Sequence, residues 1–175
     1  MGERRVTVKP PATANSDVIV AAERRFLPAA VRALASEHPV GPASVDLPGI
    51  ALVADLVGFT PTVVRLDGLG RRGHASLTEL LDRSYSAMDS IIGSFGGQTL
   101  VRIGDATVAV FPGDDPDDVR RRARQAARSI SQLRGDQPDL PSLRVGLAAG
   151  LSQLLLVPVG ERRVWTLIGD PPALA

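Results

Sequence analysis

Hydrophobic and polar positions recur with two different periods along the chain, and the change of period predicts where helices give way to strands. Residues 74–94 show the clearest helical pattern, with apolar side chains every three or four positions, and they end at a glycine pair. A second helix is predicted at about 116–134, because acidic residues open it at its positive end. The stripe of the first helix consists of Leu77, Leu80, Leu81, Ser84, Met88, Ile91 and Phe95.

Short apolar runs between these helices predict strands. The run 49–55 comes directly before "GFTP", where we expect a helix capped by Thr60 with Pro61 in its first position. Gly104 and Asp105 form a two-residue hairpin signal between two further runs. The remaining strands are predicted at 98–103, 106–111, 143–150, 152–159 and 162–168.

The first 47 residues are predicted to be a tail and a helix ahead of a main domain over residues 48–175. Residues 16–36 have roughly helical spacing with a break near Pro28. The stretch "SEHPVGPASVDLPG" is rich in proline and glycine and is predicted to be a loop.

The order of the elements predicts an α+β fold, a ferredoxin-like split βαβ sandwich. Right-handed crossover makes the first and second strands parallel, and the hairpin can then place the third strand between them. The helices would cover one face of the sheet. In this topology the end of the first strand lies beside the start of the third, so we expect Asp55 and Asp105 to meet at one edge.

The amino-acid composition limits which kinds of catalytic and binding site the chain can form. The chain has 175 residues with 44% hydrophobic and 22% charged, which is typical of a globular domain. It has no cysteine and two histidines, which excludes thiol chemistry and makes a zinc site unfavourable. A net charge of +1 gives no reason to expect nucleic acid or membrane binding. The N-terminal "MGERRVTVKPP" lacks the apolar core of a signal peptide, so a cytoplasmic location is expected.

Asp55 and Asp105 are each a single acid within an apolar run. Two neighbouring carboxylates repel each other unless a cation lies between them, and Mg²⁺ accepts carboxylates together with phosphate oxygens. A helix beginning beside Asp55 would add N–H groups that bind phosphate. This predicts a metal–triphosphate site. Spacing alone supports the metal site and a simpler alternative equally well. In that alternative Asp55 only caps a turn and Asp105 only forms a hairpin.

Four stretches resemble, in order, the landmarks of class III nucleotidyl cyclases, over roughly residues 48–172. The closest resemblance is to the metal-bearing first catalytic domain of soluble adenylyl cyclase and its bacterial relatives. That resemblance implies conversion of ATP to 3′,5′-cyclic AMP and pyrophosphate with two Mg²⁺ or Mn²⁺ ions. The stretches are "ALVADLVGFT", "FGGQTLVRIGDATVAVF", "LRVGLAAG" and "VWTLIGD".

The resemblance also assigns roles to residues. Asp55 and Asp105 match the two metal-binding aspartates, which are the catalytic residues, and Leu56 would offer its backbone carbonyl to one ion. Thr166 matches a purine-contacting position that is Asp in many members. The N–H groups over the phosphates would be those of Val57, Gly58, Phe59 and Thr60.

The chain differs from the family at the positions that contact the purine and the transition state. Val101 replaces the purine-binding Lys, which argues against bicarbonate control, and Ala173 replaces the transition-state Asn. The matching Arg would fall beyond Ala175, so the domain is predicted to be truncated before its last elements. We therefore expect the metal-donating half of a site completed by a second cyclase-like domain, in the same chain or in a dimer partner. The alternative is a catalytically degenerate regulatory or dimerisation module.

Overall fold

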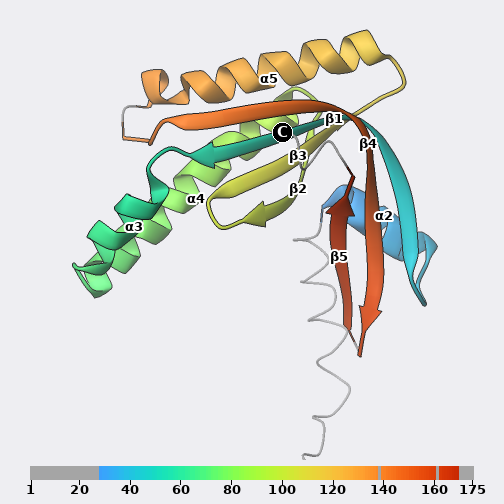
Figure 1. The fold of residues 1–175 in the computed structure, drawn as a ribbon, viewed down its shortest axis with the longest axis horizontal. Coiled ribbons are helices and arrows are strands. Elements are labelled where there is room, and N and C mark those ends of the chain that lie inside the picture. The colour runs from blue at the N-terminus through green and yellow to red at the C-terminus, as the bar shows by residue number, and fades with distance from the viewer. Residues whose placement is uncertain (1–27, 138, 161, 170–175) are drawn as a thin grey trace, which may run out of the picture.

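Five antiparallel strands form one curled sheet in the order β2-β3-β1-β4-β5 (Figure 1). The structure is a computed structural model, and it describes residues 28–137, 139–160 and 162–169. The strands are β1 (Ala43–Leu56), β2 (Gln98–Ile103), β3 (Ala106–Pro112), β4 (Leu143–Val159) and β5 (Arg162–Ile168). The helices are α2 (Ala29–Glu37), α3 (Phe59–Asp67), α4 (Arg71–Ser94) and α5 (Pro116–Asp136).

The strand order confirms the predicted split βαβ sandwich. Strand β3 lies between β1 and β2 and is antiparallel to both, so β1 and β2 run parallel. The predicted hairpin between β2 and β3 is present, with Gly104 at a φ of 62°. Glycine suits this turn because a side chain is disfavoured at positive φ.

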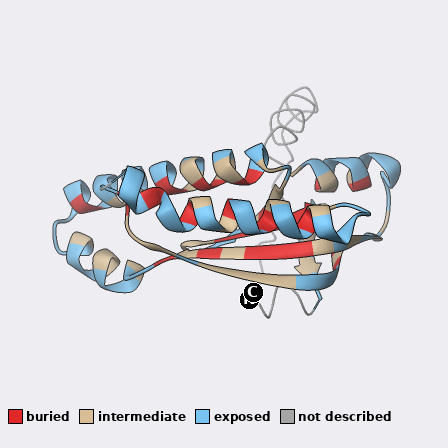
Figure 2. Ribbon diagram, turned by 90° about the horizontal axis from the view of Figure 1, so that it is seen from above, coloured by how far each residue is buried: buried red, intermediate tan, exposed pale blue. Residues whose placement is uncertain are grey.

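Helices α4 and α5 cover one face of β1, β3 and the first half of β4, as Figure 2 shows from above. The even-numbered residues Ile50, Leu52 and Ala54 of β1 face these helices. Because successive side chains of a strand point to opposite faces, Asp55 faces away from α4 and α5. The buried core under the helices also contains Met88, Ile92, Ala109, Phe111, Val119, Ala123, Ala126, Ile130 and Leu133.

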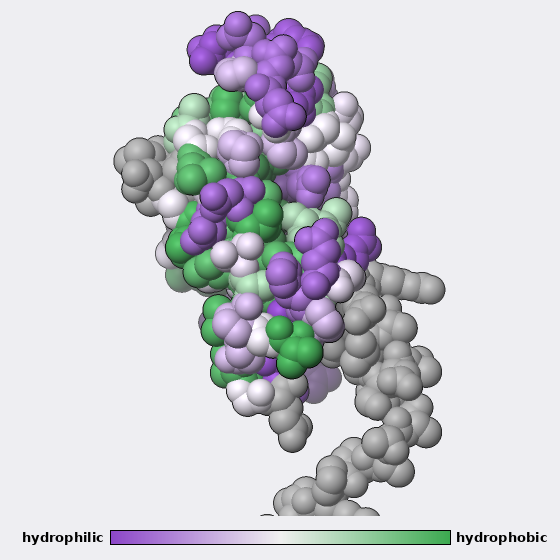
Figure 3. Space-filling model, turned by 90° about the vertical axis from the view of Figure 1, so that its right-hand side faces the viewer, coloured by the Kyte–Doolittle hydropathy of each residue, from purple (hydrophilic) through white to green (hydrophobic). Residues whose placement is uncertain are grey.

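Helix α2 packs at the other end of the sheet and on the face opposite to α4 and α5, so the prediction that the helices cover one face holds only for those two helices. Its Val31 and Leu34 are buried against Leu154 and Leu156 of β4, and Trp165 of β5 packs beside them. The helix predicted over residues 16–36 is seen as Ala29–Glu37 in the described part of the chain, and residues 16–27 lie outside that part. The surface at this end mixes hydrophobic and hydrophilic patches (Figure 3).

Two strand predictions were wrong in their boundaries. Strand β1 begins at Ala43, so the predicted loop before residue 49 is partly strand. Pro48 is tolerated there because β1 pairs with β3 only from Gly49 onward, which leaves one side of the earlier residues unpaired. The two strands predicted at 143–150 and 152–159 are one strand, β4.

The long strands β1 and β4 bend together midway (Figure 1). Gly49 and Gly150 lie opposite each other in the ladder between them. A Cβ on Gly49 would lie 2.2 Å from the carbonyl oxygen of Phe111 in β3, so only glycine allows β1 and β3 to approach this closely.

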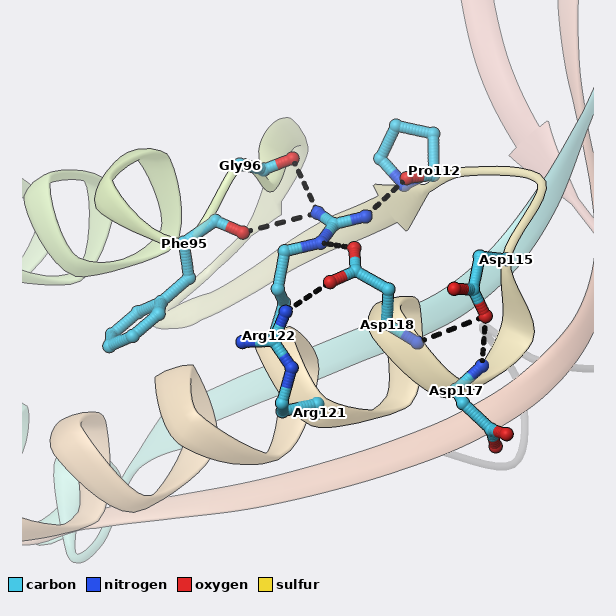
Figure 4. A network of polar contacts seen from close by, with 8 residues as sticks. All are labelled: Phe95, Gly96, Pro112, Asp115, Asp117, Asp118, Arg121 and Arg122. Atoms are coloured by element: carbon cyan, nitrogen blue, oxygen red, sulfur yellow. Dashed lines mark hydrogen bonds and ion pairs between the residues drawn. The ribbon is translucent and has the colours of Figure 1, made fainter.

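Arg122 of α5 ties the ends of three elements together (Figure 4). Its guanidinium donates to the carbonyl oxygens of Phe95, Gly96 and Pro112 at 3.2, 3.4 and 2.8 Å, and its Nε lies 2.6 Å from Asp118. This hydrogen bond from Arg122 is the main cause that lowers the pKa of Asp118 below its usual value of 3.8. The end of α4 and the end of β3 are thereby fixed to the first turns of α5.

Candidate functional site

Asp55 lies next to the last residue of β1, on the face that α4 and α5 leave uncovered. Its side chain is 36% exposed. The ladder places Arg144 of β4 directly opposite, and Arg144 Nε lies 3.5 Å from Asp55 Oδ1. The carboxylate therefore already has a neighbouring positive charge, which the sequence analysis did not foresee.

Asp105 is the second residue of the turn between β2 and β3, and its side chain reaches back to β1. The backbone N–H of Leu56 donates to Asp105 Oδ2 at 3.2 Å. The β1–β3 ladder ends at the pair Ala54–Thr107, so continuing its register by two residues sets Asp105 opposite Leu56. The structure thus brings Asp105 onto the backbone of the residue that follows Asp55, as the topology predicted.

The turn after β1 leads directly into helix α3. Gly58, with a φ of 75°, is the residue before the helix, and no side chain caps this end, so the predicted cap by Thr60 was wrong. The N–H of Val57 donates to the carbonyl oxygen of Ser142 at 2.9 Å and is not directed to a ligand. Gly58, Phe59 and Thr60 carry the N–H groups that begin α3, and such groups lack partners within a helix.

Tyr85 of α4 contacts the turn between β2 and β3, which carries Asp105. Its hydroxyl donates to the carbonyl oxygen of Gly104 at 2.5 Å, and the guanidinium of Arg102 lies 4.6 Å from the centre of its ring. Burial is the main cause that raises the pKa of Tyr85, and Asp105 and Asp82 act in the same direction while Arg102 opposes them. A neutral, hydrogen-bonded phenol therefore lies beside the turn that carries Asp105.

Thr166 lies on β5, which is two strands away from β1 in the sheet. It pairs with Leu155, eleven residues along β4 from Arg144. The indole of Trp165 donates to the carbonyl oxygen of Leu100 in β2 at 3.3 Å, so Thr166 faces the opposite way and is exposed. A hollow of about 360 Å³ lies between these strands, lined by Pro28, Asp89, Thr99, Leu100, Val101, Arg102 and Trp165.

The residues at the end of β1 fit a hard divalent cation. Aspartate carboxylates and backbone carbonyls are the oxygen donors that Mg²⁺ and Mn²⁺ accept. The Asp105 carboxylate lies on the backbone of Leu56, the residue after Asp55. In the described part of the chain no three or more His, Cys, Asp or Glu residues group around a common point. Two protein carboxylates are nevertheless enough for Mg²⁺, which usually takes its other ligands from water and substrate phosphates.

Sequence reasoning missed Arg144 and the role of Tyr85. The position of Arg144 opposite Asp55 depends on the register of β4, which the apolar pattern of that strand does not specify. The contact of Tyr85 with Gly104 depends on how α4 is placed under the hairpin, although Tyr85 lies on the stripe side of the helix. No local motif signals either contact.

Comparison with solved structures identifies the fold. A bacterial light-regulated adenylyl cyclase superposes with a TM-score of 0.65 at 22% identity, covering 91% of this chain and 48% of that chain. The guanylate cyclase domain of RhGC from Catenaria anguillulae, solved with GTP, gives 0.59 at 21% identity over 73% of this chain and 69% of that chain. A class III adenylyl cyclase-like ATP-binding protein from Pseudomonas aeruginosa gives 0.56 at 19% identity, over 78% of this chain and 31% of that chain.

The described part of the chain therefore has the fold of the class III nucleotidyl cyclase catalytic domains. The chain spans about half the length of the light-regulated cyclase that it matches. No known family profile and no curated protein matches the sequence. Among the helices described, none is both long and apolar enough to cross a bilayer.

Proposed function

We propose that this chain is the metal-donating half of a class III adenylate cyclase, which converts ATP to 3′,5′-cyclic AMP and pyrophosphate in the cytoplasm. The observation that carries the proposal is the hydrogen bond from Leu56 N–H to Asp105, which sets the second acid beside Asp55. Both acids lie where α3 begins. The cyclase fold of the relatives supports the same assignment.

Each residue of this edge has a task that follows from its chemistry. Asp55 and Asp105 would bind two Mg²⁺ or Mn²⁺ ions with the Leu56 carbonyl, and bound ions activate a hydroxyl and offset phosphate charge. The N–H groups of Gly58, Phe59 and Thr60 would donate to phosphate oxygens, which a helix N-terminus favours. Of the four residues first assigned to the phosphates, Val57 contributes no free N–H because Ser142 accepts it.

A second cyclase-like domain, in the same polypeptide or in a dimer partner, is part of the proposal. The family resemblance assigns the purine to Thr166, which is exposed on β5, two strands away from β1 in the sheet, so a second domain would supply the purine-binding half of the site that the two acids begin. Around Thr166 the same sheet face exposes Val157, Val164 and Ile168, which are 39%, 47% and 44% exposed. Exposed apolar side chains gathered on one face are typical of protein contact surfaces.

The deciding experiment measures cyclic nucleotide formation from ATP and from GTP with Mn²⁺. It compares this chain alone with the full-length gene product. We expect cyclic AMP from the full-length product and little from the chain alone. Asp55→Ala or Asp105→Ala should reduce the rate on the order of a hundredfold or more, because either change removes a ligand that stabilises transition-state charge.

Asp46→Ala is the matched control, since Asp46 is an aspartate of the same strand whose carboxylate accepts a hydrogen bond from Gln153 instead. Its activity should stay close to that of the unchanged protein. Full activity of both site variants would refute the metal assignment, and cyclic GMP as the main product would refute the assignment of ATP.

A regulatory, catalytically degenerate module is the second candidate. Arg144 lies beside Asp55, and Val101 stands where the family resemblance expects the purine-binding Lys, so a regulatory domain would also show these features. One matching structure is itself described as a cyclase-like ATP-binding protein. Nucleotide binding without product in both samples of the assay would select this candidate.

A further inference from the structure

The hairpin that carries Asp105 has little inherent support. Its turn lies at the end of β2, which is an edge strand of the sheet, and Gly104 and Ile103 are exposed. A carboxylate at such a position samples many placements unless its backbone is held. Two hydrogen bonds hold this turn, one from Leu56 N–H to the Asp105 side chain and one from the Tyr85 hydroxyl to the Gly104 carbonyl.

These two bonds hold adjacent residues of the turn from different elements. Leu56 belongs to β1 and Tyr85 belongs to α4, so the turn is fixed both along the sheet and against the helix layer. The Tyr85 bond acts on the backbone itself and leaves the Asp105 carboxylate available. A ligand that approaches Asp105 therefore meets a turn already in place.

A set of connected side-chain contacts holds Tyr85 in place. The Arg102 guanidinium stacks on its ring and forms an ion pair with Asp89, which lies one helical turn after Tyr85. The other carboxylate oxygen of Asp89 accepts from Thr99 Oγ1 at 2.8 Å. Thr99 and Arg102 both belong to β2, so these contacts hold the edge strand β2 against α4.

The ring and the hydroxyl of Tyr85 have separable effects. The ring packs at the border of the core formed with α4 and α5 and gives the base for Arg102. The hydroxyl reaches past that core to the turn. Replacing Tyr85 by phenylalanine keeps the packing and the stacking and removes the bond to Gly104.

We propose that Tyr85 is a positioning residue that holds the Gly104-Asp105 turn in the place where Asp105 can bind a divalent cation. This inference rests on the proposed function, since it assumes that Asp105 is a metal ligand. Tyr85 acts through the turn and contacts neither metal nor nucleotide.

The test measures binding of Mn²⁺ alone to the full chain by electron paramagnetic resonance of the free ion, together with thermal unfolding. Tyr85→Phe should weaken Mn²⁺ binding about three- to tenfold, the effect of losing roughly one hydrogen bond of preorganisation. Its melting temperature should stay within a few degrees of the unchanged protein. Hydrogen exchange at the Leu56 amide should become faster in the metal-free variant, because the Asp105 carboxylate that accepts from it is less firmly held.

Ser94→Ala is the matched control, because Ser94 also lies in α4 and its hydroxyl also donates to a carbonyl, that of Ile91 at 2.8 Å, away from the turn. It should leave Mn²⁺ binding and Leu56 exchange unchanged. Asp105→Ala gives the reference for loss of the metal ligand.

The outcomes distinguish the role of Tyr85 from the existence of the metal site. Unchanged Mn²⁺ binding in Tyr85→Phe, with binding lost in Asp105→Ala, would overturn the role of Tyr85 and leave the proposed function standing. Equal Mn²⁺ binding by Asp105→Ala and the unchanged protein would overturn the metal site and the role of Tyr85 with it. Weakening by Ser94→Ala as large as that by Tyr85→Phe would show a general effect of α4 stability and would also overturn the inference.

Discussion

At the scale of single residues, a positive charge lies beside the Asp55 carboxylate, which we propose as a metal ligand. Arg144 lies opposite Asp55 at 3.5 Å, and its side chain is 73% exposed. An exposed ion pair contributes little to stability, because water solvates both charges and the long arginine loses freedom when it is held. Under the proposed function, Arg144 would therefore compete only weakly with a metal ion for the same carboxylate.

Replacing Arg144 by methionine should strengthen Mn²⁺ binding about two- to fivefold, which corresponds to the energy of an exposed ion pair. Titration of the metal-free chain with Mn²⁺ checks this, with Arg128→Met of α5 as the control for a lost positive charge elsewhere. Weaker Mn²⁺ binding in Arg144→Met would show that Arg144 supports the site and does not compete with the ion.

At the scale of elements, Arg122 is the contact that holds α5 against the ends of α4 and β3 (Figure 4). Arg122→Met should lower the free energy of unfolding by roughly 2–3 kcal/mol, because it leaves the partly buried carbonyls of Phe95 and Pro112 without their charged donor. Denaturant unfolding measures this change. The lowered pKa of Asp118 implies that the stabilising ion pair is present above the usual aspartate range and is lost as the pH falls below it.

Arg121→Met is the control for that change, since Arg121 pairs with the same Asp118 but is 62% exposed. It should change the free energy of unfolding by less than about 0.5 kcal/mol. Equal losses from the two variants would show that the ion pair, and not the carbonyl contacts, provides the stabilisation.

The elements also show what a sequence can and cannot predict. Helices α4 and α5 and the β2–β3 hairpin follow from local signals, namely apolar spacing, an acidic helix start and a Gly-Asp turn. The first half of β1 was missed because Pro48 and Gly49 usually end a strand, and here pairing with β4 overrides that preference. The position of Asp105 at the end of β1 followed from topology, whereas the contacts of Arg144 and Tyr85 required the register of β4 and the placement of α4.

At the scale of the whole molecule, Gly49 lets β1 approach β3 closely midway along the curled sheet. Gly49→Ala should lower the free energy of unfolding by roughly 3 kcal/mol or more, because its Cβ would lie 2.2 Å from the Phe111 carbonyl oxygen. Calorimetry or chemical denaturation measures the loss.

Gly93→Ala in α4 provides the opposite control. A Cβ there meets no atom within 4 Å. This variant should raise the free energy of unfolding by about 0.5–1 kcal/mol, because alanine favours a helix more than glycine does. A stable Gly49→Ala variant would mean that β1 and β3 can separate at this point without cost.

The unbroken course of β4 restricts how the length of this protein can vary. Within this strand Arg144 lies opposite Asp55 and Leu155 lies opposite Thr166. Adding or deleting one residue between those positions would turn every later side chain to the other face of the sheet. Leu154 and Leu156 would then leave their contacts with α2. Insertions and deletions can therefore accumulate in the loops, while the spacing within β4 has to stay constant.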